Sequence, residues 1–396
     1  MTEFLEGHRL VLLNSGRDYF PALLEAIEGA TREIFLETYI FANDAAGQAV
    51  AVALMAAARR GVAVRVLVDG FGARRFPEIF GPALAAAGAH YKVYRREIAR
   101  FSPRRHSLRR LHRKLVVIDG RVAFVGGINI IDDASPLGPD LPSYDYAVRV
   151  EGPLLSVIHR TVARMWTFQK AMDGFRMERD WRNARPRLRP DSPPPVFHAR
   201  GCKLAFLLRD NLRHRNTIAN AYLAAIREAR HTILIANAYF LPGFRFRRAL
   251  RNAARRGTAV TVLLQGESDH RLFRYATQAI YGDLLADGIR VFEYRGGFLH
   301  AKVAVIDGHW ATVGSSNIDP FSLFLAREAN VAVKDTAFAA ELASSLTTAM
   351  REGAVEWTME THARQPFHLR LLRRLSYELV KFLVNLAGYG HEDRKN

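Results

Sequence analysis

The chain of 396 residues has a single cysteine, Cys202, and no long hydrophobic run. One cysteine excludes an internal disulfide and any zinc or iron–sulfur site built from several cysteines. Because no stretch approaches the roughly 18 apolar residues of a spanning helix, no transmembrane segment is predicted. The opening residues, MTEFLEGHRL, lack the positive charge and the apolar run of a secretory signal. The sequence therefore predicts a cytosolic protein.

Acidic residues are also scarce, with 39 against 57 basic ones and a formal net charge of +18. Only eight of the basic residues are lysine, so arginine dominates. Guanidinium groups bind phosphate bidentately, and such a surface suits nucleic acid, anionic lipid headgroups or another phosphate-rich partner. The densest run, RRHSLRRLHRK at 104–114, is expected to attract anions to the motif that follows it.

Two stretches repeat within the chain: LHRKLVVIDGRVAFVGGIN at 111–129 and LHAKVAVIDGHWATVGSSN at 299–317. The histidine, lysine, aspartate and asparagine of the first copy each recur 188 residues later. Upstream, AARRGVAVRVLVDG at 57–70 agrees with AARRGTAVTVLLQG at 253–266 at ten of 14 positions. Self-similarity of this kind indicates a duplicated structural unit.

Both halves alternate helical segments with β-branched runs. Strands are expected at 33–40, 62–68 and 90–94 in the first half and at 232–239, 258–264 and 289–294 in the second. Strands that alternate with helices favour a parallel sheet covered by helices. The predicted fold class is α/β, with two similar domains, each a mixed, mostly parallel β-sheet flanked by helices.

A segment rich in proline and arginine, at 185–201, separates the halves and is typical of a linker. We expect four parts: an N-terminal domain at 1–172, a linker at 173–200, a C-terminal domain at 201–360 and a basic amphipathic tail at 361–396.

In the tail, leucine and phenylalanine recur at helical spacing. One face would carry Leu371, Leu375, Leu379, Phe382 and Leu386, and the other largely Arg370, Arg373, Arg374, Glu378 and Lys381. The pattern suits a helix lying in a membrane interface, and equally a terminal helix packed on its domain.

The repeated motif begins with a histidine and a lysine that project from one face of a strand, His112 with Lys114 and His300 with Lys302. The Asp-Gly dipeptide that follows suits a tight hairpin turn. If that turn has two residues, His112 lies opposite Gly127, which leaves space for a substrate above the imidazole, and His300 lies opposite Ser315, which is also small.

The remaining motif residues divide into two groups. Asp119 and Asp307 lie at the turns, about 20 Å along the strand from the histidines, and are expected to be structural. Asn129 and Asn317 return to the histidine end, where their amides can donate to an anion. Because protonated lysine is not a metal ligand, no metal is expected. The two histidines, two lysines and two amides are expected to face the substrate together, and such a set fits displacement at phosphorus.

A carboxylate also heads a strand after each hairpin, Asp145 in DYAVRV and Glu328 in EANVAV. A carboxylate that accepts from imidazole Nδ1 fixes the tautomer and leaves Nε2 free to attack or protonate. We expect Asp145 and Glu328 to orient the histidines, although a solvated strand end has the same pattern.

The pattern His-x-Lys-(x)4-Asp, present at 112–119 and 300–307, resembles the paired HKD motifs of the phospholipase D superfamily. Within it, the segments IANAYFLPG and VFEYRGGFLHAKVAVIDGHWATVGSSNIDP resemble the bacterial cardiolipin synthases of the short B-type. The resemblance implies two domains related by a pseudo-twofold axis, with both motifs, including Asp119 and Asp307, at one active site and no cofactor.

The resemblance also implies a reaction. One histidine attacks a phosphatidylglycerol to form a phosphohistidine, the other protonates the departing glycerol, and a second phosphatidylglycerol accepts the phosphatidyl group to give cardiolipin. Family analogy favours His112 as the nucleophile and His300 as the acid and base, and near-symmetry leaves the reverse open. The expected partners are phosphatidylglycerol and an anionic membrane surface, with no nucleic acid, and the expected location is peripheral, on the cytoplasmic face of the cell membrane.

Three alternatives remain at this point. A phospholipase D that hydrolyses its lipid to phosphatidic acid would carry the same residues, because only exclusion of water separates hydrolysis from transfer. A nuclease of the superfamily would also suit the positive charge. A membrane-binding protein without activity is disfavoured by the intact pairs His112 with Lys114 and His300 with Lys302.

Overall fold

The computed structural model describes residues 3–95, 109–135, 138–174, 196–199, 201–210, 213–267 and 270–386. None of the helices in these ranges is both long and apolar enough to cross a bilayer. Three predicted features fall partly outside them: most of the linker at 173–200, residues 104–108 of the basic run, and residues 387–396 of the tail.

The first half consists of β1 (Leu5–Asn14), α1 (Ser15–Glu28), β2 (Glu33–Thr38), α2 (Ala45–Arg59), β3 (Ala63–Asp69), α3 (Phe76–Ile79), α4 (Gly81–Ala86), β4 (His90–Tyr94), β5 (Lys114–Ile118), β6 (Val122–Gly126), β7 (Ala134–Ser135), β8 (Gly138–Tyr144), β9 (Tyr146–Glu151) and α5 (Leu155–Gly174). The second half consists of β10 (Cys202–Arg209), α6 (Thr217–Glu228), β11 (Thr232–Asn237), α7 (Phe244–Arg255), β12 (Ala259–Gln265), α8 (Arg271–Gln278), α9 (Tyr281–Ala286), β13 (Arg290–Tyr294), β14 (Phe298–Leu299), β15 (Lys302–Ile306), β16 (Trp310–Gly314), α10 (Pro320–Phe324), β17 (Glu328–Lys334), α11 (Thr336–Gly353), β18 (Ala354–Trp357), α12 (Met359–Ala363) and α13 (Phe367–Leu386). The six strands expected from β-branched runs are β2, β3, β4, β11, β12 and β13.

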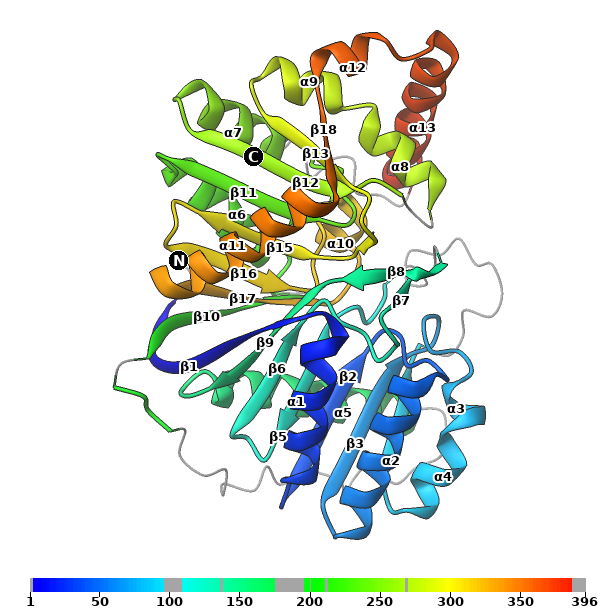
Figure 1. The fold of residues 1–396 in the computed structure, drawn as a ribbon. Coiled ribbons are helices and arrows are strands. Elements are labelled where there is room, and N and C mark those ends of the chain that lie inside the picture. Colours follow the sequence, from blue (N-terminus) through cyan, green and yellow to red (C-terminus); the bar gives the residue numbers. More distant parts are fainter. Residues whose placement is uncertain are drawn as a thin grey trace.

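A sheet of 15 strands runs through both halves, and the antiparallel pair β1 and β10 joins them (Figure 1). Outward from this pair the strand order is β1-β9-β6-β5-β2-β3-β4 in the first half and β10-β17-β16-β15-β11-β12-β13 in the second. These seven strands of each half therefore lie at corresponding places, and the fifteenth strand, β18, pairs with β13 at the outer edge of the second half. The prediction of two similar α/β halves is confirmed.

The prediction that the sheet is mostly parallel is wrong. Within the large sheet, only β2, β3 and β4, and their counterparts β11, β12 and β13, pair in parallel. The other neighbours in the large sheet are antiparallel. Helices connect the parallel strands, as the alternation predicted, whereas β5 and β6 form a hairpin, and a hairpin can pair only antiparallel.

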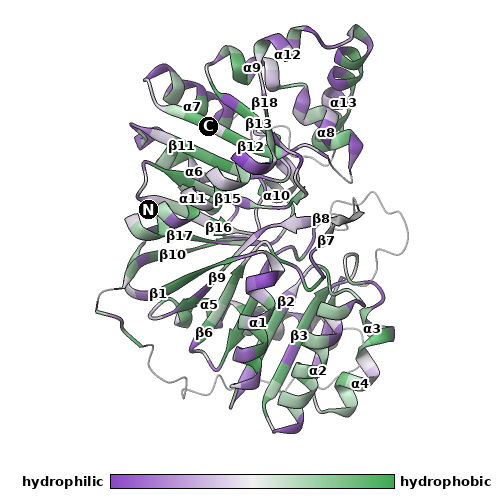
Figure 2. Ribbon diagram, in the orientation of Figure 1, coloured by the Kyte–Doolittle hydropathy of each residue, from purple (hydrophilic) through white to green (hydrophobic). Residues whose placement is uncertain are grey.

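Helices cover both faces of the sheet. One face of the first half packs against α1, α2 and α4, and one face of the second half against α6, α7 and α9. On the other side, α5 and α11 pack into a single core that contains strand residues of both halves. Figure 2 shows hydrophobic residues along most of the central strands. This shared core fixes the two halves against each other, and so fixes the motif of one half against that of the other.

The hairpin between β5 and β6 has one more residue than predicted. Asp119 and Gly120 both have positive φ, 54° and 65°, and Arg121 N donates to Ile118 O at 3.0 Å. Strand pairing resumes one residue later, with Ile118 opposite Val122 and Lys114 opposite Gly126. The second copy repeats this geometry, with Ile306 opposite Trp310. The expected pairings of His112 with Gly127 and of His300 with Ser315 are therefore wrong by one residue.

Candidate active site

Each motif histidine lies just before a strand and is tied by its backbone to the other half of the chain. His112 N donates to Arg327 O at 3.0 Å, and His300 N donates to Tyr144 O at 2.8 Å. Arg327 and Tyr144 immediately precede the two strand-head carboxylates, Glu328 and Asp145. The residues before each carboxylate thus hold the histidine of the opposite half.

The imidazole rings follow the same crossed arrangement. His112 Nδ1 donates to both carboxylate oxygens of Glu328, at 2.9 and 3.2 Å. His300 Nδ1 donates to Asp145 Oδ2 at 2.6 Å. With Nδ1 protonated, Nε2 of each neutral ring carries the free lone pair. The sequence predicted carboxylates of this kind but gave no sign that each would serve the histidine of the other half.

Burial sets the protonation of these groups. It lowers the pKa of His300 to about 4, with Lys302 adding to the effect and Asp145 opposing it. Burial also lowers the pKa of His112, and Glu328 opposes that shift. Although burial disfavours the Asp145 carboxylate, the charge of Lys302 and the hydrogen bond from His300 hold its pKa below the ordinary value. Both imidazoles are therefore neutral at pH 7, with the Asp145 carboxylate ionised.

The two lysines lie beside the imidazoles and do not line the cavity described below. Lys114 Nζ donates to His112 O at 2.7 Å, and Lys302 Nζ donates to His300 O and lies 3.6 Å from Asp145 Oδ2. Burial lowers the pKa of Lys114 to about 7 and that of Lys302 to about 8. Each lysine therefore supports the backbone of its own histidine, a contact that the sequence did not indicate.

The two motif asparagines line the cavity, each with its amide oxygen used by backbone. Asn129 Oδ1 accepts from Ile40 N at 3.1 Å, and Asn317 Oδ1 accepts from Tyr239 N at 3.4 Å. These bonds orient the amide so that its nitrogen is the end left for a ligand, although Asn317 Nδ2 also approaches Ser322 Oγ at 3.5 Å. An amide N–H at this place is suited to an anionic oxygen.

Asp119 and Asp307 lie at the turns and do not line the cavity. Asp119 accepts from Thr31 N, Thr31 Oγ1, Arg32 N and Glu33 N at 2.8–2.9 Å. Asp307 accepts from the corresponding amides of the second half, Arg230, His231 and Thr232, at 2.8–2.9 Å. Each carboxylate therefore joins the hairpin to the start of the neighbouring strand.

We expect Asp119→Asn to lower stability by about 1–3 kcal/mol, because three amides and a hydroxyl lose an ionised acceptor. Although burial opposes ionisation, the amides of Glu33, Thr31 and Arg32 lower the pKa of Asp119 below its ordinary 3.8. The stabilisation is thus present above about pH 4 and is lost as the pH falls through the lowered value. Urea unfolding of both proteins should show a difference that narrows below pH 4. Lost turnover with unchanged stability would instead make Asp119 catalytic.

The halves differ in how each carboxylate is accommodated. A Cβ added to Gly127 would lie 2.3 Å from Asp145 Oδ1, so the glycine makes room for that carboxylate. At the corresponding position of the second half, Ser315 Oγ donates to Glu328 Oε2 at 2.5 Å. The space that the sequence assigned to a substrate therefore belongs to Asp145.

We expect Gly127→Ala to lower turnover at least about tenfold, because displacement of a positioning group by 1 Å can cost about a hundredfold. The loss should appear in kcat more than in KM, since the methyl group would push Asp145 away from His300. Gly29→Ala is the matched control for glycine replacement, because Gly29 is exposed, has a φ of -76°, and an added Cβ would make only ordinary contacts there. Wild-type kcat in Gly127→Ala would show that Asp145 need not lie where it does.

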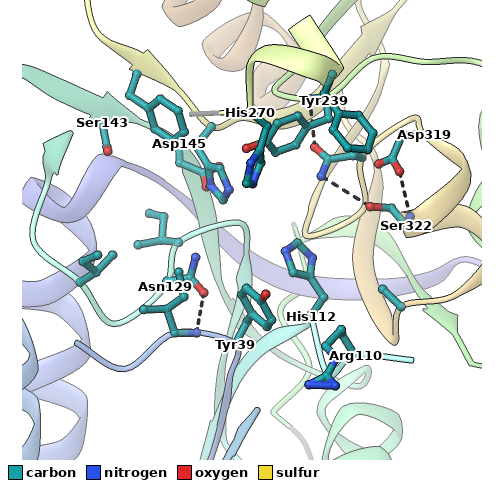
Figure 3. A pocket seen from close by; sticks show the side chains of 18 of the residues that line it. Tyr39, Arg110, His112, Asn129, Ser143, Asp145, Tyr239, His270, Asp319 and Ser322 are labelled. Atoms are coloured by element: carbon teal, nitrogen blue, oxygen red, sulfur yellow. Dashed lines mark hydrogen bonds and ion pairs between the residues drawn. The ribbon is translucent and has the colours of Figure 1, made fainter. Parts of the chain in front are cut away.

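A cavity of about 580 Å³ opens between the halves and contains both histidines (Figure 3). The other lining residues are Tyr39, Ile40, Arg110, Ile128, Asn129, Ile131, Asp132, Asp133, Ser143, Asp145, Tyr239, His270, Phe273, Phe298, Asn317, Asp319, Ser322, Leu325 and Ala326. Arg110 is the one arginine or lysine among the described residues that line it. The walls are thus largely apolar and aromatic, with a polar centre.

The surroundings of the two motif histidines differ. Near His112 lie Arg110, paired with Asp69 at 2.9 Å, and Tyr39, whose ring lies 5.0 Å from the imidazole. Near His300 lies Phe298, stacked on the ring at 5.8 Å. Arg110 and Phe298 occupy equivalent positions, 188 residues apart. The sequence interpretation included Arg110 only within the basic run at 104–114 and assigned no role to Tyr39 or Phe298. Comparing the two copies position by position would have found the difference between Arg110 and Phe298.

Two neutral imidazoles with fixed tautomers, at one cavity with amide donors, can divide nucleophilic and acid–base work on a phosphodiester. Among the residues that the structure describes, no group of three or more histidine, cysteine, aspartate or glutamate side chains is arranged to hold a metal ion. The fold and the site together define a phosphodiester-transferring enzyme of the phospholipase D type.

Comparison with known proteins gives the family. The model of the family described as "Cardiolipin synthase, PLD-like domain" matches residues 23–166 and 222–350. The chain is 41% identical over 342 residues to cardiolipin synthase B of Escherichia coli K12, covering 86% of this chain and 80% of that one. It is 31% identical over 385 residues to the major cardiolipin synthase ClsA of Bacillus subtilis 168, covering 96% and 76%. The chain belongs to the cardiolipin synthase family of the phospholipase D superfamily.

A solved structure shares the fold. The crystal structure of phosphatidylserine synthase from Haemophilus influenzae Rd KW20 superposes with a TM-score of 0.67 at 13% identity, covering 98% of this chain and 97% of that one. At that identity the likeness concerns the fold alone.

Proposed function

We propose that this protein is a cardiolipin synthase that transfers a phosphatidyl group from one phosphatidylglycerol to another, with release of glycerol. The observation that carries the proposal is the crossed pair of imidazoles at one cavity, His112 held by Glu328 and His300 held by Asp145. Relatives that are 30–41% identical over most of the chain and are named cardiolipin synthases support it. In this proposal residues 1–172 and 201–360 are two domains, each supplying one histidine.

The first step forms a covalent intermediate. Nε2 of His112 attacks the phosphorus of the donor lipid, and the bond from phosphorus to the glycerol oxygen breaks. That oxygen takes a proton from Nε2 of His300. Because an anionic phosphodiester between the rings favours their charged forms, its binding raises the low pKa of His300 and allows the ring to carry this proton.

In the second step His300 acts as a base, and the hydroxyl of a second lipid takes the place of the departed glycerol. A hydroxyl of the acceptor phosphatidylglycerol gives its proton to Nε2 of His300, and its oxygen attacks the phosphorus as the bond to His112 breaks. Glu328 and Asp145 stabilise the imidazolium that forms on their respective partners. The amides of Asn129 and Asn317 donate to the non-bridging oxygens, while the nearby ammonium groups of Lys114 and Lys302 offset the developing charge.

The proposal also specifies the substrate of the enzyme and the membrane at which it acts. Its substrate is phosphatidylglycerol, and it works peripherally at an anionic membrane on the cytoplasmic face. The net charge of +18 supports attraction to anionic headgroups. Large apolar side chains at the cavity, such as Phe273, Phe298 and Ile131, support a lipid substrate more than a nucleic acid, which needs a track of cations.

The test is incubation of the purified protein with phosphatidylglycerol labelled in the headgroup glycerol and in the phosphorus. We expect cardiolipin and free glycerol in equal amounts. Phosphatidic acid with glycerol and no cardiolipin would identify a hydrolase. An inert lipid together with cleaved single-stranded or duplex DNA would identify a nuclease and overturn the proposal.

A further inference from the structure

Exposed apolar side chains are concentrated on helix α13. Seven large ones are between 41% and 72% exposed, namely Phe367, Leu371, Leu372, Leu375, Leu379, Phe382 and Leu383. Leu371, Leu375, Leu379 and Phe382 recur at spacings of four and three residues, which sets them on one side of the helix. We call these four residues the apolar face of α13. Soluble surfaces carry scattered apolar residues, whereas a contiguous row marks a contact with a partner or a membrane.

The opposite side of α13 is packed against the protein. Arg373, Ser376 and Val380 are buried, and Val380 lies in an apolar cluster with Leu241 and Ala276. Arg373 Nε donates to Gln278 Oε1 at 2.9 Å, so this arginine, opposite the apolar face, is buried against the domain. The helix therefore packs on its domain, as one of the two sequence alternatives predicted, and also presents an exposed apolar face.

Cations border the apolar face. Arg370, Arg374 and Lys381 are exposed on the same helix, in a protein with a net charge of +18. An amphipathic helix with leucine and phenylalanine on one side and cations beside them is suited to the interface of an anionic bilayer. A second copy of this chain is a poorer partner, because pairing two such faces would bring the cations of both helices together.

The packed side of α13 leads to the cavity through α8. Phe273 of α8 lines the cavity and also packs, with Leu272, against the cluster that contains Val380. His270, just before α8, lines the cavity as well. Helix α8 therefore lies between the cavity and α13, and Figure 1 shows α8 and α13 side by side at one edge of the second half.

The first half also exposes an aromatic side chain beside arginines near the cavity. Phe71, which is 52% exposed, precedes α3, and its ring lies 5.7 Å from the guanidinium of Arg74 and 5.6 Å from that of Arg110. Arg110 lines the cavity, and so does Ile131, which is 37% exposed. In Figure 1, α3 and α13 lie on the same side of the molecule.

We infer that the apolar face of α13 inserts into the interface of an anionic phospholipid bilayer and holds the α8 wall of the cavity against it, so that lipids enter from the bilayer. The second part of this inference rests on the proposed function, since it requires lipid substrates. Insertion buries leucine and phenylalanine, while Arg370, Arg374 and Lys381 remain at the headgroups.

A fluorescent probe tests insertion directly. Cys202→Ser removes the only cysteine, and Leu375→Cys then carries an environment-sensitive dye. We expect its emission to shift to the blue with phosphatidylglycerol vesicles and much less with phosphatidylcholine vesicles. Val52→Cys is the matched control, because Val52 is 57% exposed on a helix of the other half. Equal shifts at both positions, or none at Leu375→Cys, would overturn the inference.

Introducing negative charge into the apolar face tests whether insertion of α13 is needed for turnover of lipid in vesicles. The double variant Leu375→Glu with Leu379→Glu should lower vesicle binding and vesicle turnover at least about tenfold, since carboxylates are costly in the interface. Turnover of phosphatidylglycerol in detergent micelles should stay within about twofold, and Val52→Glu should behave as wild type.

Undiminished vesicle binding by the double variant would contradict insertion of α13 into the bilayer. A wild-type dimer that the double variant dissociates would assign the face to a second copy. If wild type binds vesicles but produces no cardiolipin, the proposed function fails and docking stands.

Discussion

Replacement of either motif histidine, His112 or His300, by glutamine is expected to lower cardiolipin formation at least about 10³-fold. Glutamine can hydrogen-bond to Glu328 or Asp145 but can neither attack phosphorus nor exchange a proton at neutral pH. His159→Gln is the matched control, because His159 also pairs with a carboxylate, Glu33, at 2.7 Å, and does not line the cavity. The measurement is cardiolipin formed from labelled phosphatidylglycerol at equal concentrations of folded protein.

A donor with an activated leaving group separates the two histidines. Phosphatidyl-p-nitrophenol needs no acid for departure of p-nitrophenolate, so a variant that lacks only the acid should still release one equivalent in a burst. We expect that burst from His300→Gln and none from His112→Gln. The opposite pattern would reverse the assignment, and full cardiolipin synthesis by both variants would refute the catalytic proposal.

The second large effect is expected at the carboxylates. Asp145→Asn and Glu328→Gln should each lower kcat by about 10²–10⁴-fold, because an amide holds the imidazole in the wrong tautomer and does not stabilise its charge. In NMR spectra of histidine-labelled protein, Glu328→Gln should shift the ring signals of His112 more than those of His300. Asp145→Asn should do the reverse. If each variant instead perturbs the histidine of its own half, the crossed pairing is wrong.

The same variants have a predictable pH dependence. Asp145 raises the pKa of His300 against the effect of burial, so Asp145→Asn should lower that pKa further. The step that needs protonated His300 then fails at a lower pH, and the alkaline limb of the kcat profile should move toward acid. A limb that stays in place would mean that the proton comes from another group.

Much of the fold could be predicted from local patterns. The β-branched runs at 33–40 and 62–68 became β2 and β3, because side-chain shape and alternation act within a few residues. The Asp-Gly dipeptides predicted the turns, since aspartate tolerates the positive φ of Asp119. Turn length was not predictable in the same way. Arg121 adds one residue before strand pairing resumes, and this shifts the register between β5 and β6 by one residue.

The site depends on contacts between the halves, which no local pattern encodes. Asp145 was recognised as a strand-head carboxylate, but its partner is a histidine 155 positions later. The two residues meet because the antiparallel pair of β1 and β10, and the core that α5 and α11 share, fix the two halves against each other. The lysines were expected at the phosphate because of their charge. Their bonds to the backbone of His112 and His300 depend on how the chain bends before β5 and β15.

The central claim is that the phosphatidyl group passes through a phosphohistidine, and the configuration at phosphorus tests it most directly. Phosphatidylglycerol made chiral at phosphorus with oxygen isotopes would be converted to cardiolipin and the product analysed by ³¹P NMR. Two successive in-line displacements, on His112 and then on the acceptor hydroxyl, predict retention of configuration. Inversion would mean direct transfer between the lipids and would contradict the covalent role of His112.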